Sequence, residues 1–332
     1  MIAPLWPLLL GVTAAALSDR AQQAAQAGRP EQAERLWREA LDLDGTYFPA
    51  AFNLGLLYTN SSKWEKASAI LTRAAAIEPA DFNTHYLLGA AHARQGHGDD
   101  AIRAWRNAQR LRPTHAGVLQ LLIVEYGKGR YFAEAAEAAR AALRLAPADV
   151  NLSLMAIKAF QDAGEAAEAS MLARDVVGRY PEHPRANFEH AFHLQRAGKN
   201  EEAFQYLEKA MRLAPEYEEP FFLYGDLCVK LGQPGKALEP LRQAITNRGD
   251  FVAARIVLAR ALMQLDRLDE AAGELDQAIQ RDPKQPQPHL LLSQIYFRLG
   301  KEDRAREEKN LSLRLRRENP EALEVAQGRA FR

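Results

Sequence analysis

The chain has 332 residues, with 43 basic and 43 acidic side chains and a net charge near zero. Nucleic acids and acidic membranes attract proteins through excess positive charge, so this balance argues against both kinds of partner. A single cysteine excludes an internal disulfide framework and a zinc site made of several thiolates. The 60 alanines and the low aromatic content of 8% are typical of a helical chain, and the Ala- and Arg-rich composition indicates a bacterial protein.

The N-terminal segment, residues 1–16, is apolar and uncharged. Its apolar core is too short and too interrupted by proline to span a membrane. We expect a signal peptide cleaved after Ala16, with Ser18 capping the first helix of the mature chain, and therefore a periplasmic or secreted protein whose only membrane contact is that signal or anchor. No basic residue precedes the apolar core. The alternatives are a cytoplasmic protein whose N-terminal segment packs on the first helix, or a start codon further upstream.

A period of 34 residues runs through most of the chain. Prolines recur at this spacing, and an alanine stands twelve residues before each of them. The prolines are Pro79, Pro113, Pro147, Pro181 and Pro215, and the alanines extend further in both directions as Ala33, Ala67, Ala101, Ala135, Ala169, Ala203, Ala237, Ala271 and Ala305. We infer nine repeats, at 14–47, 48–81, 82–115, 116–149, 150–183, 184–217, 218–251, 252–285 and 286–319, followed by a C-terminal tail at 320–332.

Each repeat is predicted to form two helices. Glycine recurs near the middle of the repeat, as at Gly28 and Gly96, and proline recurs near its end, so both helices have a natural stop. The small residues between these breakers allow two helix axes to approach closely, and a larger side chain there would overpack the contact. Each hairpin exposes an apolar face that its neighbours bury.

These repeats resemble the tetratricopeptide repeat family, which the second repeat matches at Leu54, Gly55, Tyr58, Ala67, Ala74 and Pro79. The resemblance covers roughly residues 14 to 319. It implies an all-α, right-handed superhelical solenoid in which the first helix of every repeat lines a concave groove. Ile157, Ala191 and Ala259 depart from the family glycine of that helix, and we expect them to pack less like the family average.

The groove implied by the resemblance would be lined by an unusually apolar set of side chains. Its expected apolar residues are Phe52, Leu56, Tyr86, Leu87, Leu121, Val124, Phe188, Phe192 and Phe222. Three charged residues of the same groove are expected to tune binding, namely Lys158, Asp226 and Arg260. An exposed apolar surface of this kind is typical of a docking site for a helix or an extended segment. The alternative is that the aromatic side chains pack between repeats. The double substitution Phe188→Ala and Phe192→Ala is expected to abolish partner binding without loss of helix.

No motif for chemistry occurs in the chain. Phosphate-binding loops, nucleophile elbows and zinc-protease motifs are absent from the sequence, so we expect no catalytic residue, no cofactor and no small-molecule substrate. His190 and His193 lie close in sequence to His183 and Glu189, but we interpret them as packing residues of their repeat, not as metal ligands. Cys228 stands at a position that is apolar in other repeats and is interpreted as a buried hydrophobic residue.

The ninth repeat ends differently from the others, because Lys309 replaces a residue that is apolar in the eight preceding repeats. A polar residue there is expected of a capping helix, whose outer face needs solubility. The sequence as a whole predicts a non-catalytic scaffold or adaptor that binds partner proteins or peptides. The alternative is a regulatory or substrate-recruiting subunit of an enzyme, such as a glycosyltransferase or a peptidase, with catalysis in another chain.

Overall fold

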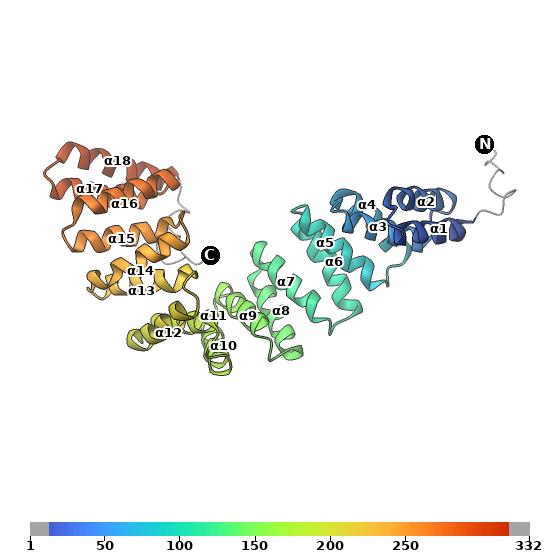
Figure 1. Ribbon diagram of the computed structural model, residues 1–332, viewed down its shortest axis with the longest axis horizontal. Coiled ribbons are helices and arrows are strands. Elements are labelled where there is room, and N and C mark those ends of the chain that lie inside the picture. The colour runs from blue at the N-terminus through green and yellow to red at the C-terminus, as the bar shows by residue number, and fades with distance from the viewer. Residues whose placement is uncertain (1–12, 319–332) are drawn as a thin grey trace. The chain divides into compact units, whose positions relative to one another are not determined.

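The computed structural model describes residues 13–318, and this part of the chain consists of helices joined by short turns (Figure 1). The helices are α1 (Ala14–Gln26), α2 (Pro30–Leu43), α3 (Phe48–Asn60), α4 (Trp64–Ile77), α5 (Phe82–Arg94), α6 (Gly98–Leu111), α7 (Ala116–Lys128), α8 (Phe132–Leu145), α9 (Val150–Asp162), α10 (Ala166–Arg179), α11 (Pro184–Arg196), α12 (Asn200–Leu213), α13 (Glu218–Lys230), α14 (Pro234–Asn247), α15 (Val252–Gln264), α16 (Leu268–Arg281), α17 (Pro286–Arg298) and α18 (Glu302–Glu318). The all-α repeat architecture predicted from the sequence is confirmed. The chain divides into two compact units, Met1–Ala169 (unit 1) and Ser170–Arg332 (unit 2), with the division inside α10.

Every repeat contributes one odd-numbered helix, here called helix A, and one even-numbered helix, here called helix B. Helix A begins at the first residue of each expected repeat, from Ala14 in α1 to Pro286 in α17. Within each unit, helix A packs on helix B of its own repeat, helix B packs on helix A of the next, and most consecutive A helices also touch. Contacts between neighbours therefore build the stack, as expected of a repeat protein.

The turn between helix A and helix B places one residue in the left-handed region of backbone space. Six of the nine residues at this position are glycines, with φ between 69° and 80°. The other three are Ser62, Arg130 and Asp266, with φ of 55°, 62° and 61°. Because a side chain in this region costs about 1–2 kcal/mol, glycine is the residue that fits the turn with least strain.

The alanines of the periodic column lie where helices meet, and all nine are buried. Helix A has a glycine at its eighth position in three repeats. A Cβ added at Gly55 would lie 2.5 Å from Leu71, and one added at Gly89 would lie 2.4 Å from Trp105. In the fourth repeat the sizes are exchanged: a buried Ile123 on helix A is matched by the buried Ala139 on helix B.

The three departures from the family glycine are accommodated in the core. Ile157, Ala191 and Ala259 are each fully buried. Ala191 packs in a cluster with Leu207, and Ala259 packs in a cluster with Leu275. These positions differ in size from glycine but keep the same buried place in helix A.

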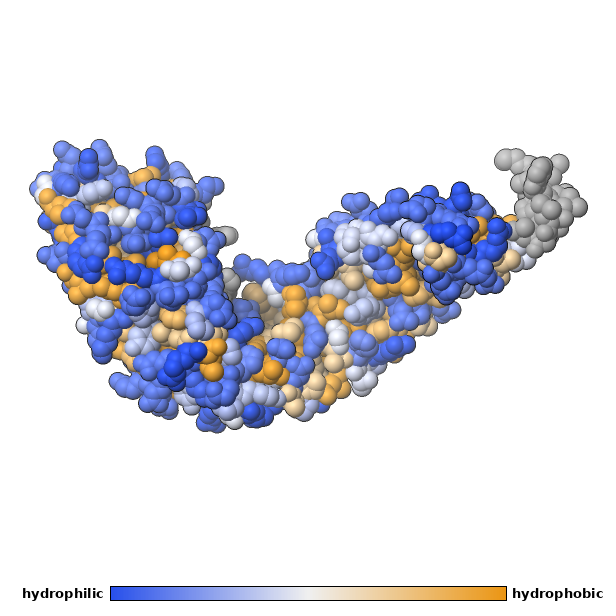
Figure 2. All heavy atoms as spheres, viewed as in Figure 1, coloured by the Kyte–Doolittle hydropathy of each residue, from blue (hydrophilic) through white to orange (hydrophobic). Residues whose placement is uncertain are grey.

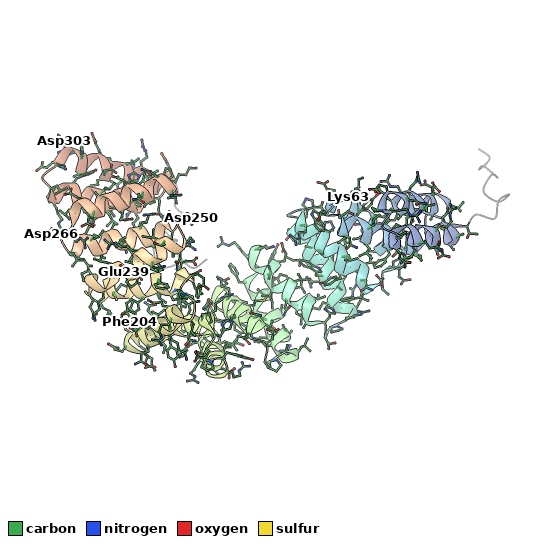
Figure 3. The ribbon with its side chains drawn as sticks, in the orientation of Figure 1. Lys63, Phe204, Glu239, Asp250, Asp266 and Asp303 are labelled. Atoms are coloured by element: carbon green, nitrogen blue, oxygen red, sulfur yellow. The ribbon has the colours of Figure 1, made fainter. Side chains whose placement is uncertain are left out.

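Ion pairs add to the apolar contacts between consecutive repeats. Lys63 of the α3–α4 turn lies 3.5 Å from Glu34 of the preceding repeat. Asp266 of the α15–α16 turn lies 2.6 Å from Arg298 of the following repeat. Figure 3 labels Lys63 and Asp266 at these two turns, each on the rim of its stack. Exposed pairs of this kind contribute about 0–1 kcal/mol each, so packing dominates the stability of the stack.

The two ends of the described chain differ from the interior repeats. Helix α1 begins at Ala14 after Thr13, whose hydroxyl accepts the Ala16 N–H at 3.1 Å. In this chain Thr13, not Ser18, caps the first helix, and the expected cleavage bond lies in the first turn of α1. Residues 1–12 of the expected signal peptide and the expected tail at 320–332 lie outside the described residues, so export stays a prediction.

The last helix, α18, has the polar outer face expected of a cap. Lys309 is exposed, whereas Ala305, Ser312 and Leu315 are buried against α17 and its turn. The Ser312 hydroxyl donates a hydrogen bond of 2.8 Å to the carbonyl oxygen of Pro286. Among the helices of residues 13–318, none is both long enough and apolar enough to cross a membrane.

Candidate protein-interaction surface

Helix A buries one face and leaves a second face partly open. In α3 the buried face consists of Ala50, Ala51, Leu54, Gly55 and Tyr58, while Phe52 and Leu56 between them are only half-buried. The same face of α5 and α7, at the fifth, sixth and ninth helix positions, is also half-buried or exposed. We call the resulting set the apolar strip of unit 1: Phe52, Leu56, Tyr86, Leu87, Leu121 and Val124.

All six residues of the apolar strip offer surface to solvent. Five are half-buried, and Val124 is 45% exposed. In Figure 2 hydrophobic residues gather over the part of unit 1 that contains α5 to α8, among hydrophilic neighbours. Half of the residues expected to line a groove are therefore available for contact with a partner, and they lie in consecutive repeats of one unit.

Aromatic rings support the strip from beneath. Phe82 stacks on Tyr86 with ring centroids 5.9 Å apart, and the His115 ring lies 4.9 Å from Phe82 and 6.0 Å from Tyr86. The Arg112 guanidinium sits over the Phe82 ring at 4.2 Å. Trp105 donates its indole N–H to the carbonyl oxygen of Tyr86 at 3.1 Å. These contacts hold Tyr86 in position from both helices of its repeat and from the start of the next.

The structure corrects the expected groove at two positions in unit 2. Phe188 and Phe222 are each only 5% exposed and belong to the hydrophobic core. Phe188 meets Tyr217 edge-on at 5.5 Å, and Phe222 packs on Phe251 at 4.9 Å. Phe192 is half-buried against the same core cluster as Phe188. Substituting Phe188 and Phe192 together therefore removes core atoms as well as surface atoms, and it does not test partner binding cleanly.

The residue just before the next helix A explains this difference in burial. Tyr217 and Phe251 occupy this place and cover the ring at the fifth position of helix A in the same repeat. Asp81 occupies it in the second repeat, where it caps α5 by accepting the Thr84 N–H at 2.6 Å and leaves Phe52 uncovered. The role of Tyr217 and Phe251 was not predicted from the sequence, although an aromatic residue at the end of a repeat can be recognised there as a residue that covers helix A.

The charged residues expected to tune binding are partly neutralised within their own helices. Lys158 lies 2.7 Å from Asp162, and Asp226 lies 2.6 Å from Lys230, each four residues further along. Arg260 is half-buried and makes no ion pair within residues 13–318. Of the three charged side chains, Arg260 is the one whose charge is available to pair with a partner.

Three of the residues singled out in the sequence lie in the core, namely His190, His193 and Cys228. His190 and His193 are buried, and burial lowers the pKa of both imidazoles, that of His193 to about 4. His183 caps α11 by accepting the Ala186 N–H at 3.3 Å. Cys228 is fully buried, which raises the pKa of its thiol to about 11. Over the described part of the chain, His183, Glu189, His190 and His193 do not converge as a ligand set.

Helix hairpins of constant length, close small-residue contacts and a partly open helix-A face define an α-helical repeat protein. Family models described as tetratricopeptide repeat match residues 24–91, 83–107, 154–218, 222–286 and 257–322. The chain belongs to the tetratricopeptide repeat family, as its sequence pattern predicted.

The solved structures to which the chain is similar match about half of it. MamA from Desulfovibrio magneticus RS-1, residues 41 to the end, is 18% identical, with a TM-score of 0.47, over 51% of this chain and 96% of that one. YrrB, a tetratricopeptide repeat protein with an unusual peptide-binding site, is 21% identical, with a TM-score of 0.47, over 57% of this chain and 98% of that one. Comparison with the curated proteins gives no match.

Proposed function

We propose that this protein is a non-catalytic scaffold that binds a partner protein through the apolar strip of unit 1. The observation that carries the proposal is the solvent-accessible surface of six apolar side chains at the fifth, sixth and ninth positions of α3, α5 and α7. An apolar patch left open on a repeat protein is typical of a surface that binds another chain. The ligand that best fits regularly spaced apolar side chains is a helix or an extended segment with apolar residues at its own regular spacing.

The strip has the physical properties that binding requires. Its side chains are attached to rigid helices and supported by packed rings, so little conformational entropy is lost when a partner docks. Each apolar side chain that becomes fully covered contributes about 25 cal/mol for every Å² removed from water. Covering several together is sufficient for a specific but reversible contact.

The test is a triple substitution on the strip, Leu56→Ser, Leu121→Ser and Val124→Ser, in the full chain. None of these three side chains is among the buried residues of the described chain, so the helix content measured by circular dichroism should stay unchanged. Partners are captured by affinity purification from cells of the source organism and quantified by mass spectrometry. We expect the partner bound by the wild-type chain to fall at least about tenfold, because each lost apolar contact costs about 1 kcal/mol or more.

A matched control removes three exposed apolar residues that lie outside the strip: Leu145→Ser, Met171→Ser and Phe297→Ser. Their exposed fractions are 40%, 67% and 69%. This control should retain the partner. Equal capture by the strip variant and the control would contradict the proposal.

A further inference from the structure

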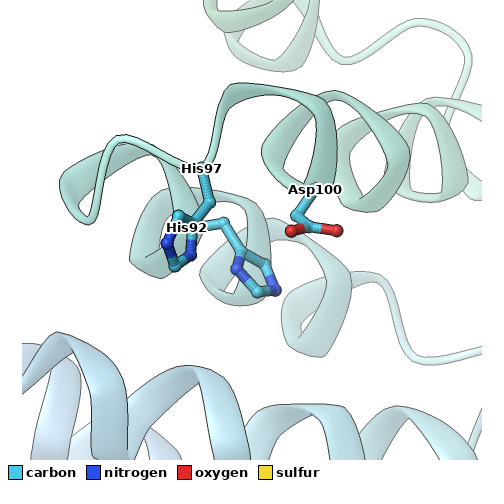
Figure 4. Close-up of side chains that lie close together, drawn as sticks. All are labelled: His92, His97 and Asp100. Carbon is cyan, nitrogen blue, oxygen red and sulfur yellow. The ribbon is translucent and has the colours of Figure 1, made fainter.

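Three potential metal ligands converge at the turn between α5 and α6, on the third repeat. His92 lies near the end of α5, His97 precedes α6 and Asp100 lies in the first turn of α6 (Figure 4). One ligand atom from each side chain lies within 4.8 Å of the other two. This is the only such group of three histidine, cysteine or acidic residues within residues 13–318, and none of its members belongs to the apolar strip.

The site has one buried atom that lacks a partner. The Nδ1 atom of His92 is shielded from solvent and makes no hydrogen bond. A buried polar atom without a partner loses roughly 1–3 kcal/mol of solvation free energy, which is why most such atoms in folded proteins are satisfied. A ligand that binds at this place would remove that cost.

The other two ligands can adjust. A tetrahedral zinc ion with bonds of about 2.1 Å needs its ligand atoms about 3.4 Å apart, so the present spacing must contract by about 1 Å. His97 is exposed and its side chain does not cap α6, so its ring can turn toward His92. The two rings are already 6.1 Å apart between centroids.

The charges at the site are those that a divalent cation needs. His92 and His97 each offer a ring nitrogen whose lone pair can bind a metal ion. Asp100 accepts a hydrogen bond from the Arg103 guanidinium and offers its carboxylate oxygens to the site. Arg103 is exposed and pairs with one oxygen of Asp100, so a bound cation would compete with this guanidinium.

The geometry points to a site for a divalent transition-metal ion of the zinc class, held by His92, His97 and Asp100 and completed by water. Two imidazoles and one carboxylate are a ligand set that zinc accepts, whereas Mg²⁺ and Ca²⁺ prefer oxygen ligands alone. Because its ligands come from helix A, the turn and helix B, the ion would join the two helices of the third repeat on the surface of unit 1.

The experiment is isothermal titration calorimetry of the full chain with ZnCl₂, with MgCl₂ as the hard-ion comparison. We expect one Zn²⁺ per chain and no heat from Mg²⁺. His97→Ala, which removes an exposed side chain and should leave folding intact, is expected to weaken Zn²⁺ binding at least about tenfold. Asp100→Asn should weaken it to a similar extent.

Asp99→Asn is the matched control for Asp100→Asn. It makes the same change of charge on the neighbouring residue, whose carboxylate accepts a hydrogen bond of 2.9 Å from the Tyr131 hydroxyl instead. This control should bind Zn²⁺ like the wild type. Arg103→Gln should tighten binding about two- to fivefold, because it removes the cation that competes for Asp100.

Two outcomes would overturn the inference. The first is a wild-type chain that shows no stoichiometric Zn²⁺ binding. The second is Zn²⁺ binding that His97→Ala and Asp100→Asn leave unchanged, which would place the ion on other histidines of the chain. Neither outcome bears on the proposed function, because the strip experiment uses different residues.

Discussion

Phe52 and Phe222 occupy equivalent positions of their repeats, yet only Phe52 remains half-exposed. The difference comes from one other residue, at the end of the same repeat. Phe251 covers Phe222 with a ring, whereas Asp81 caps the following helix and leaves Phe52 open. In these two repeats the residue at the end of the repeat therefore decides whether the aromatic ring on helix A is covered or open.

A buried histidine makes unit 2 sensitive to acid. The pKa of His193 is lowered to about 4 by burial, against an ordinary value of 6.5. Between pH 4 and pH 6.5 the His193 imidazole is protonated in the unfolded chain and neutral in the folded chain. The free energy of unfolding therefore falls as the pH drops from 6.5 toward 4. We expect unit 2 to lose about 1–2 kcal/mol from this residue between pH 7 and pH 5.

This prediction is checked by urea unfolding of the full chain at the two pH values, followed by hydrogen exchange of the α11 peptides. His193→Leu should reduce the loss, because the group that titrates is gone. Phe192→Leu on the same helix removes no titratable group and should leave the loss unchanged. An equal loss in His193→Leu and the wild type would assign the acid sensitivity to other residues.

At the scale of elements, helix A and helix B of one repeat share a fixed volume where they cross. Gly55 on α3 faces Leu71 on α4, whereas in the fourth repeat Ile123 is matched by Ala139. Since protein interiors are close-packed, a gain of volume on one helix requires a loss on the other.

The exchanged side-chain sizes in the fourth repeat predict that a second substitution can restore stability lost by a first one in the second repeat. Gly55→Ile alone would drive a side chain into Leu71, and we expect it to cost about 1–3 kcal/mol or more through overpacking. Gly55→Ile combined with Leu71→Ala copies the pair found at Ile123 and Ala139 and should recover most of that loss. Thermal unfolding of the two variants measures both the loss of stability and its recovery. A double variant no more stable than Gly55→Ile would show that the two positions do not share one volume.

Most features of the helices and turns could be predicted from the sequence, because the 34-residue period places them relative to the recurring glycines and prolines. The helix starts, the left-handed turn residue and the buried alanine column all follow from spacing alone. The candidate surface was only half predictable, since exposure at the fifth position depends on a residue about thirty positions away. The group of His92, His97 and Asp100 was missed because its members lie on both sides of a turn, whereas the search for ligands followed His190 and His193 along a single helix.

At the scale of the whole molecule, stability is built from contacts between neighbouring repeats, in two compact units. Such a stack responds locally to damage, because each repeat touches only those beside it. Nothing in the period distinguishes the fifth repeat, so the division inside α10 could not be predicted from the sequence.

Local response is testable with two equivalent core substitutions. Leu71→Ala in α4 and Leu241→Ala in α14 each truncate a fully buried side chain, and each should cost about 2–5 kcal/mol. Measured by hydrogen exchange with mass spectrometry, Leu71→Ala should reduce protection in α3 to α6 and leave α13 to α16 unchanged. Leu241→Ala should show the reverse. Loss of protection in both regions from either substitution would mean that the chain unfolds as one cooperative body.

The buried alanine column separates two properties that are joined in most globular folds, the size of the protein and the chemistry of its binding surface. Because the same buried alanine column recurs in every repeat, a whole 34-residue segment could be duplicated or deleted without creating a new kind of interface. The length of the array and the chemistry of its open face can therefore evolve independently. A lineage could lengthen the protein to reach a larger partner while the residues that recognise that partner stay as they are.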